Sequence, residues 1–171
     1  MKLFIDRIDS PIGTILLVAD NESLCALDYA GYEHRMMKLL QARYAQISLQ
    51  ETPDPCGLSS VLRRYLAGDL ACVDHIPVNT GGTGFQQEVW FALRRIPPGS
   101  VMTYGEMAAQ LGRPTAYRAV GMTNALNPIA IVVPCHRLVG ANGALTGYAG
   151  GLNRKKWLLE HEGVNCERLT R

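Results

Sequence analysis

The chain has 171 residues, of which 47% are hydrophobic and 19% charged, and its formal net charge is +2. This composition is typical of a globular protein and excludes a disordered chain. No apolar run approaches the roughly 20 residues of a membrane span, and Asp6 and Asp9 interrupt the segment where a signal peptide would be apolar. We therefore expect a cytoplasmic protein without a membrane segment.

The charge is divided unevenly along the chain. Residues 1–84 hold seven Lys or Arg and ten Asp or Glu (7 − 10 = −3), whereas residues 85–171 hold ten and five (10 − 5 = +5). The second part could attract a polyanion, and a solvated basic surface is the alternative. The cysteines are odd in number and widely spaced, which favours a reduced protein without disulfides or a metal site; they are Cys25, Cys56, Cys72, Cys135 and Cys166.

The first part of the chain predicts an antiparallel meander followed by helices. Short apolar runs at 3–8, 14–19 and 23–29 are separated by turn residues, which indicates three strands. Helices are predicted over 32–45 and from residue 58, where apolar residues recur at helical spacing until Gly68.

A glycine-rich segment, Asn79 to Gly84, is the predicted domain boundary. Such a loop could also hold a phosphate, but the lysine of a P-loop is missing. We expect one domain over 1–82 and another over 83–171.

The second part opens with three predicted helices. Thr83 with Gln86, and Thr103 with Glu106, have the spacing of a capping box, and they start helices over 85–96 and 104–111. Thr115 could cap a third helix over 115–125. The last two, joined by a short turn, predict a helix-turn-helix.

The remaining elements surround a cysteine. The run 129–133 predicts a buried strand, Asn142-Gly143 a hairpin turn, and Asn153 the cap of a last helix that Gly163 ends.

Cys135 is the candidate nucleophile, in the sequence Pro134-Cys135-His136-Arg137. A thiolate is a strong nucleophile, and nearby cations or a base promote its formation. The alternative is a small buried hydrophobic residue. Glu162 is a candidate to orient the imidazole. Adjacent side chains of an extended segment point to opposite faces, so Cys135 and His136 require a turn at Pro134 or a bridging water.

Several ordered motifs resemble the methylated-DNA–protein-cysteine methyltransferases, the 6-O-alkylguanine-DNA alkyltransferases, and especially the bacterial Ogt type. They are YGEMAAQLG, RAVG followed by NP, PCHR, GYAGG and KKWLLEHEG, and together they cover residues 83–163 almost continuously. The resemblance implies an α+β fold, with an N-terminal antiparallel-sheet domain of the ribonuclease H-like kind and a C-terminal helical domain with a winged helix-turn-helix.

The resemblance also implies a role for each matching residue. Cys135 would accept the alkyl group, His136 would take its proton through a water, and Glu162 would hold His136. Asn127 would brace the turn before the cysteine, and Tyr104 would contact the target base and donate a proton toward it. Arg118 would fill the gap left in the DNA stack. The other implied contacts to DNA or the base are Thr115, Ala119, Gly121, Arg137, Tyr148, Ala149 and Lys155.

The implied reaction is a direct, irreversible transfer from 6-O-alkylguanine, or 4-O-alkylthymine, in double-stranded DNA to Cys135. It needs no cofactor or metal, it happens once per molecule, and we expect a monomer. Three positions depart from the family pattern: Tyr117 and Ala149 stand where a small residue and a serine are common, and Gly84 replaces a frequent proline.

Two other functions remain open from the sequence. A DNA module that binds lesions without chemistry is one, although such relatives lack the acceptor cysteine. A Cys–His hydrolase is the other, but it needs an oxyanion site for which the sequence offers no evidence.

Overall fold

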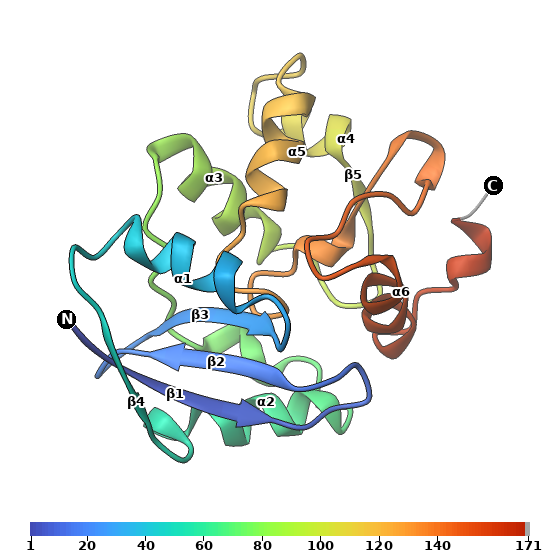
Figure 1. Cartoon of the computed structure of the whole chain (residues 1–171). Helices are drawn as coiled ribbons and strands as arrows, with labels where there is room; N and C mark the ends of the chain where they lie inside the picture. The colour runs from blue at the N-terminus through green and yellow to red at the C-terminus, as the bar shows by residue number, and fades with distance from the viewer. Residues whose placement is uncertain (170–171) are drawn as a thin grey trace. The chain divides into compact units, whose positions relative to one another are not determined.

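The computed structural model describes residues 1–169, which form two compact units (Figure 1). The first unit comprises Met1–Gly81 and Pro128–Val132, and the second comprises Gly82–Asn127 and the chain from Val133 onward. Both units contain helices and strands, so the predicted α+β class is confirmed. No helix in the described part of the chain is long and apolar enough to cross a membrane.

A four-stranded sheet is the centre of the first unit. The strands are β1 (Lys2–Ile8), β2 (Ile15–Ala19), β3 (Leu24–Tyr29) and β4 (Ser48–Glu51), in the order β3-β2-β1-β4. The meander β1-β2-β3 is antiparallel as expected. β4 was not expected, and it pairs parallel to β1, so the sheet is mixed. Its sequence SLQE has three exposed residues out of four and lacks the alternation that marks a half-buried strand.

Two helices, α1 (Glu33–Gln41) and α2 (Leu58–Leu66), pack against this sheet (Figure 1). All residues of β2 and β3 are buried, which requires cover on both faces of the sheet. Met36 and Leu40 of α1 lie in one apolar cluster with Leu3 and Leu16 of the strands. Helix α1 is shorter than the predicted range 32–45.

The second unit contains four helices among its described residues. They are α3 (Gly84–Leu93), α4 (Tyr104–Gln110), α5 (Tyr117–Ala125) and α6 (Leu152–His161). Two short strands, β5 (Met102–Thr103) and β6 (Leu138–Val139), pair in parallel. Single turns of 3-10 helix occur in both units, at Pro55–Gly57, Cys72–His75, Cys135–Arg137, Ala141–Gly143 and Cys166–Arg168.

The caps decide where these helices begin and end. Both predicted capping boxes are present: the hydroxyls of Thr83 and Thr103 accept from the third helical N–H, and the side chains of Gln86 and Glu106 accept in return. Two other predicted caps are wrong. Ala116 and Gly151, and not Thr115 and Asn153, are the N-caps of α5 and α6. Neither makes a side-chain hydrogen bond, because alanine and glycine have no polar side chain.

The predicted strand over 129–133 is wrong, although every residue in it is buried. Ile129 makes one isolated bridge with Leu27. The chain then turns sharply, because Val132 N–H donates to the carbonyl of Ala130 at 2.8 Å and Ile131 has a φ of 70°. A β-branched residue in this region is strained by about 1–3 kcal/mol. An apolar run alone cannot reveal such a turn.

Candidate active site

Cys135 follows a tight turn centred on Pro134. The N–H of Cys135 donates to the carbonyl of Val133 at 2.8 Å, and Pro134 has φ −81° and ψ 67°, the conformation of an inverse γ-turn. Cys135, His136 and Arg137 then form one turn of 3-10 helix. The segment is therefore not extended, and it contains the turn at Pro134 that the sequence analysis required.

Two asparagines hold this turn from the end of α5. Nδ2 of Asn127 donates to the carbonyl of Val133 at 2.7 Å, and Nδ2 of Asn124 donates to the carbonyl of Cys135 at 3.2 Å. Both side chains are buried. The predicted position of Asn127 beside the turn is thus found, while the contact of Asn124 was not predicted.

The strands β5 and β6 bring Tyr104 to the same place. Met102 pairs with Leu138 and Thr103 with Val139, so the start of α4 lies beside the segment that follows Cys135. The capping box at Thr103 starts α4 at Tyr104.

A buried ion cluster lies directly after the cysteine. Nε2 of His136 lies 2.9 and 3.0 Å from the two carboxylate oxygens of Glu162. Nε and Nη2 of Arg137 donate to the same carboxylate, each at 2.9 Å, and Nη1 donates to the carbonyl of Ile96. The side chains of His136 and Glu162 are fully buried. This bidentate pair was not predicted.

The end of α6 places Glu162 for this role. Gly163 has a φ of 94°, its N–H donates to the carbonyl of Glu160, and the N–H of Val164 donates to that of Leu159. These two bonds form a Schellman motif, in which glycine avoids the strain of a positive φ. The predicted stop at Gly163 therefore also fixes the residue before it.

The cluster has defined charges. Burial alone would raise the pKa of Glu162, but the charge and hydrogen bonds of His136 and Arg137 outweigh burial and hold that pKa well below its usual range. Burial lowers the pKa of His136, against the opposite effect of Glu162. At neutral pH the carboxylate is therefore ionised, and the imidazole carries one proton only.

The tautomer of His136 follows from its partner. An ionised carboxylate accepts hydrogen bonds and donates none, so the ring proton lies on Nε2. Nδ1 then carries a lone pair, and it is buried without a hydrogen-bond partner. A neutral imidazole oriented by a carboxylate is the arrangement of a general base.

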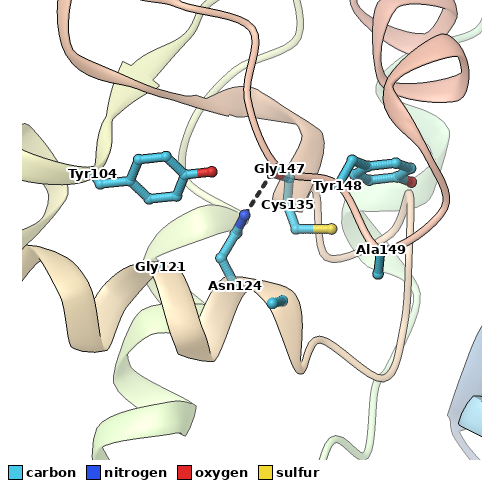
Figure 2. Close-up of a pocket in the computed structure, with 8 residues that line it drawn as sticks. Tyr104, Gly121, Asn124, Cys135, Gly147, Tyr148 and Ala149 are labelled. Carbon is cyan, nitrogen blue, oxygen red and sulfur yellow. Dashed lines mark hydrogen bonds between the residues drawn. The ribbon is translucent and has the colours of Figure 1, made fainter.

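A cavity of about 230 Å³ opens at Cys135 (Figure 2). Tyr104 lies on one side of the sulfur, and Tyr148 and Ala149, the two residues predicted to form the wall of a base pocket, lie on the other. The remaining lining residues are Gly121, Asn124, Ala125 and Gly147. Burial raises the pKa of Tyr104, so its hydroxyl keeps its proton and can act as a donor.

Lys155 supports the loop that carries Tyr148. Its Nζ donates to the carbonyls of Leu138, Thr146 and Gly147, the last two at 2.7 and 3.1 Å. The residue is fully buried, and burial lowers its pKa to about 8. Lys155 is therefore close to the pocket, but it cannot reach a phosphate on the surface.

Arg137, which was also predicted to contact DNA, lies in the interior with 2% exposure. Its guanidinium pairs with Glu162 instead, and this opposite charge compensates the desolvation of the buried carboxylate. A direct contact of Arg137 with DNA is thus contradicted.

The other predicted DNA contacts lie on or beside α5. Thr115, Arg118 and Ala119 are exposed, and Gly121 lines the cavity. The guanidinium of Arg118 lies 5.9 Å from the ring centre of Tyr117, which is itself half exposed. Arg118 is at the surface and is not among the lining residues of the cavity.

Sequence reasoning missed Asn124, although a signal was available. On a helix, residues three apart share a face. Asn124 follows Gly121 by three positions, so the two residues lie on the same face of α5. The prediction of Gly121 as a contact should therefore have extended to Asn124.

Known proteins share this architecture over nearly the whole chain. Residues 4–80 match the family model described as "6-O-methylguanine DNA methyltransferase, ribonuclease-like domain". Residues 84–164 match the model described as "6-O-methylguanine DNA methyltransferase, DNA binding domain". The chain belongs to the 6-O-methylguanine DNA methyltransferase family. The resemblance inferred from the sequence motifs is therefore confirmed.

Individual members of the family are similar in sequence and in structure. Methylated-DNA–protein-cysteine methyltransferases of Salmonella typhimurium strain LT2 and Shigella flexneri are 51% and 49% identical over 166 residues, covering 95% of this chain and 97% of each relative. The crystal structure of Mycobacterium tuberculosis OGT in complex with DNA has a TM-score of 0.78 and 39% identity, covering 98% of this chain and 95% of that one.

Proposed function

We propose that this chain repairs alkylated double-stranded DNA by moving the alkyl group of 6-O-alkylguanine, or of 4-O-alkylthymine, onto Sγ of its own Cys135. The observation that carries the proposal is the position of Cys135: it lies on the wall of a cavity, one residue before a buried imidazole that a carboxylate orients. Family membership and the names of its relatives support the same reaction.

The first step of the proposed reaction is deprotonation of the Cys135 thiol. Nδ1 of His136 is unprotonated and has no partner, so it can accept the Cys135 proton through one bridging water. The imidazolium that forms faces Glu162, whose carboxylate stabilises it. Arg137 keeps that carboxylate ionised without taking part in the transfer.

The thiolate then attacks the alkyl carbon. A sulfur–carbon bond forms while the bond between that carbon and the exocyclic oxygen breaks, and the electron pair moves into the base. The hydroxyl of Tyr104 donates toward the base and offsets the developing negative charge. The product is a thioether, which offers no carbonyl carbon for water to attack, so each molecule reacts once.

The target base must leave the helix to reach the sulfur. An exocyclic oxygen within a stacked pair is inaccessible, and extrusion of a nucleotide costs a few kcal/mol. The exposed face of α5 supports contact with DNA, because small residues such as Ala119 permit close approach, and Arg118 is long and planar enough to occupy the vacated position. The net charge of +5 in residues 85–171 favours a polyanion.

The two predicted domains, 1–82 and 83–171, differ in their part in the proposed reaction. Every residue of the reaction lies in the second. We expect the protein to act as a monomer, since one copy holds the complete site. A thiol nucleophile requires reducing surroundings, for which the cytoplasm is the proposed location.

The test is to incubate the protein with a duplex that contains one 6-O-methylguanine and to weigh the intact protein. One added methyl group, localised to the Cys135 peptide and reaching one equivalent, is the expected result. Unchanged mass with tight lesion binding would indicate a non-catalytic DNA module, and repeated ester turnover would indicate a hydrolase.

Cys135→Ala is the matched variant. It should lose transfer completely and still bind the lesion, because the pocket walls remain. Transfer that survives in Cys135→Ala would assign the reaction to another cysteine.

A further inference from the structure

Tyr117, the first residue of α5, presents an aromatic ring at the surface. The residue is 48% exposed, and within residues 1–169 its hydroxyl makes no hydrogen bond. The guanidinium of Arg118 lies 5.9 Å from the ring centre, within the range of a cation–π contact. The contact with Arg118 is thus the specific interaction that this side chain makes.

Arg118 is the second residue of α5, where a cation is electrostatically unfavourable. The positive end of the helix dipole lies there, and no residue of the first turn is acidic. Within residues 1–169 the Arg118 side chain makes no hydrogen bond or ion pair, whereas the exposed Arg64 and Arg113 each pair with a carboxylate. The ring of Tyr117 is therefore the partner that the protein supplies to this guanidinium.

The position of Arg118 on α5 also relates it to the cavity. Residues three and four apart on a helix share a face, and Gly121, three residues after Arg118, lines the cavity at Cys135 together with Ala125. A base that enters the cavity therefore leaves the DNA helix beside α5. Arg118 is the long exposed side chain that the first turn of α5 offers to the vacated position.

A tyrosine ring beside such an arginine changes the cost of using it. Arginine has many rotamers, and ordering them opposes every contact that the side chain makes. A ring face attracts the guanidinium and narrows the range of these rotamers. Because no carboxylate has to be released, the guanidinium exchanges one flat aromatic surface, the ring, for others of the same kind, the bases.

We propose that Tyr117 is a positioning residue for Arg118: its ring orders the guanidinium in the free protein, so that Arg118 enters the stack readily when the target nucleotide leaves it. The ring face performs this role and the hydroxyl does not. The inference rests on the proposed function, and it assigns a residue that acts through Arg118 and not through the pocket.

The test compares single-turnover repair of 6-O-methylguanine in duplex DNA with the reaction of the free base. The ratio of the two rates cancels changes in the pocket and in the thiol. Tyr117→Ala and Tyr117→Leu should lower this ratio by about two- to fivefold, the value of one exposed cation–π contact. Tyr117→Phe keeps the ring and should keep the wild-type ratio.

A double-mutant cycle separates positioning from direct contact with DNA. In the Arg118→Ala background, Tyr117→Ala should lower the ratio no further, because the side chain that it positions is gone. Phe91→Ala is the matched control: Phe91 is 63% exposed on α3, and the guanidinium of Arg95 lies 4.9 Å from its ring centre, so it forms the same kind of pair on another helix. This variant should retain the wild-type ratio.

The outcomes distinguish the two levels of the proposal. A wild-type ratio in both Tyr117→Ala and Tyr117→Leu overturns the role of Tyr117, and so does an equal loss in Tyr117→Phe or in Phe91→Ala. A full further loss in the Arg118→Ala background would assign Tyr117 a direct contact with DNA instead. A wild-type protein that transfers no methyl group from the duplex overturns the proposed function itself.

Discussion

The two units differ most in what their interiors contain. Unit 1 is built around a sheet with an apolar core, whereas the interior of unit 2 holds most of the buried polar groups. Among the described residues, the buried polar or charged side chains are Asp28 and Ser59 in unit 1, and Thr123, Asn124, Asn127, His136, Arg137, Lys155 and Glu162 in unit 2.

The ion pairs show the same contrast. In unit 1, Asp28 lies 2.8 Å from Arg35, whose side chain is 24% exposed. In unit 2, Arg137 and Glu162 are 3% and 0% exposed. Buried ions rarely add stability compared with apolar residues of the same shape. Their concentration around one cysteine therefore indicates that unit 2 is organised for chemistry at the expense of stability.

Removal of one carboxylate should have the largest effect. Glu162→Ala leaves the guanidinium of Arg137 buried without its counter-ion, which costs about 3–5 kcal/mol in the free energy of unfolding. It also removes the partner that fixes the tautomer of His136. Both tryptophans, Trp90 and Trp157, lie in unit 2, so their fluorescence during urea unfolding reports this loss.

The matched control is Asp28→Ala in unit 1. Arg35 is partly exposed and can be hydrated, so we expect a smaller cost of about 1–3 kcal/mol and an unchanged rate of alkyl transfer. Equal losses in the two variants would show that burial of the ion pair in unit 2 has no special energetic weight.

The sequence predicted the features that depend on local chemistry. The capping boxes at Thr83 and Thr103 and the glycine stop at Gly163 are short-range patterns, in which a side chain or a positive φ satisfies the helix ends. The cysteine, its histidine and Glu162 were found because motifs mark them, and the structure brings the last two within 2.9 Å.

The pairing of a buried charge with a residue distant in the chain could not be predicted from the sequence. Arg137 looks like a surface cation in a basic segment, and only the fold shows that it neutralises Glu162, 25 residues away. The strand predicted over 129–133 failed because apolar composition reports burial, whereas the turn at Ile131 depends on its tertiary surroundings. β4 was missed because an edge strand can be mostly exposed.

Arg118 tests the surface of unit 2 separately from its interior. Arg118→Ala should leave the urea midpoint unchanged, because an exposed side chain contributes little to folding. It should slow repair of a lesion in duplex DNA by about tenfold, a fraction of the few kcal/mol needed to extrude a nucleotide, and leave the reaction with free 6-O-methylguanine almost unaffected. Single-turnover rates on the two substrates measure this difference, and equal slowing on both would argue against a role in filling the stack.

The smallest expected effect is a decrease in the free energy of unfolding on acidification, caused by the buried polar groups of unit 2. Burial lowers the pKa of His136 below its ordinary value of 6.5, so in the folded state it takes up a proton only at a lower pH than in the unfolded state. The unfolded chain therefore binds more protons, and stability that is complete above pH 6.5 declines as the pH falls below it, by at most about 1.4 kcal/mol per pH unit. Glu162, whose pKa is also lowered, adds a further loss of stability when the pH falls below its ordinary pKa of 4.5.

Urea unfolding of unit 2, followed by tryptophan fluorescence between pH 7 and 5, should show this decline in stability, and His136→Gln should make the pH dependence flatter. A slope that His136→Gln leaves unchanged would assign the acid sensitivity to groups outside the cluster.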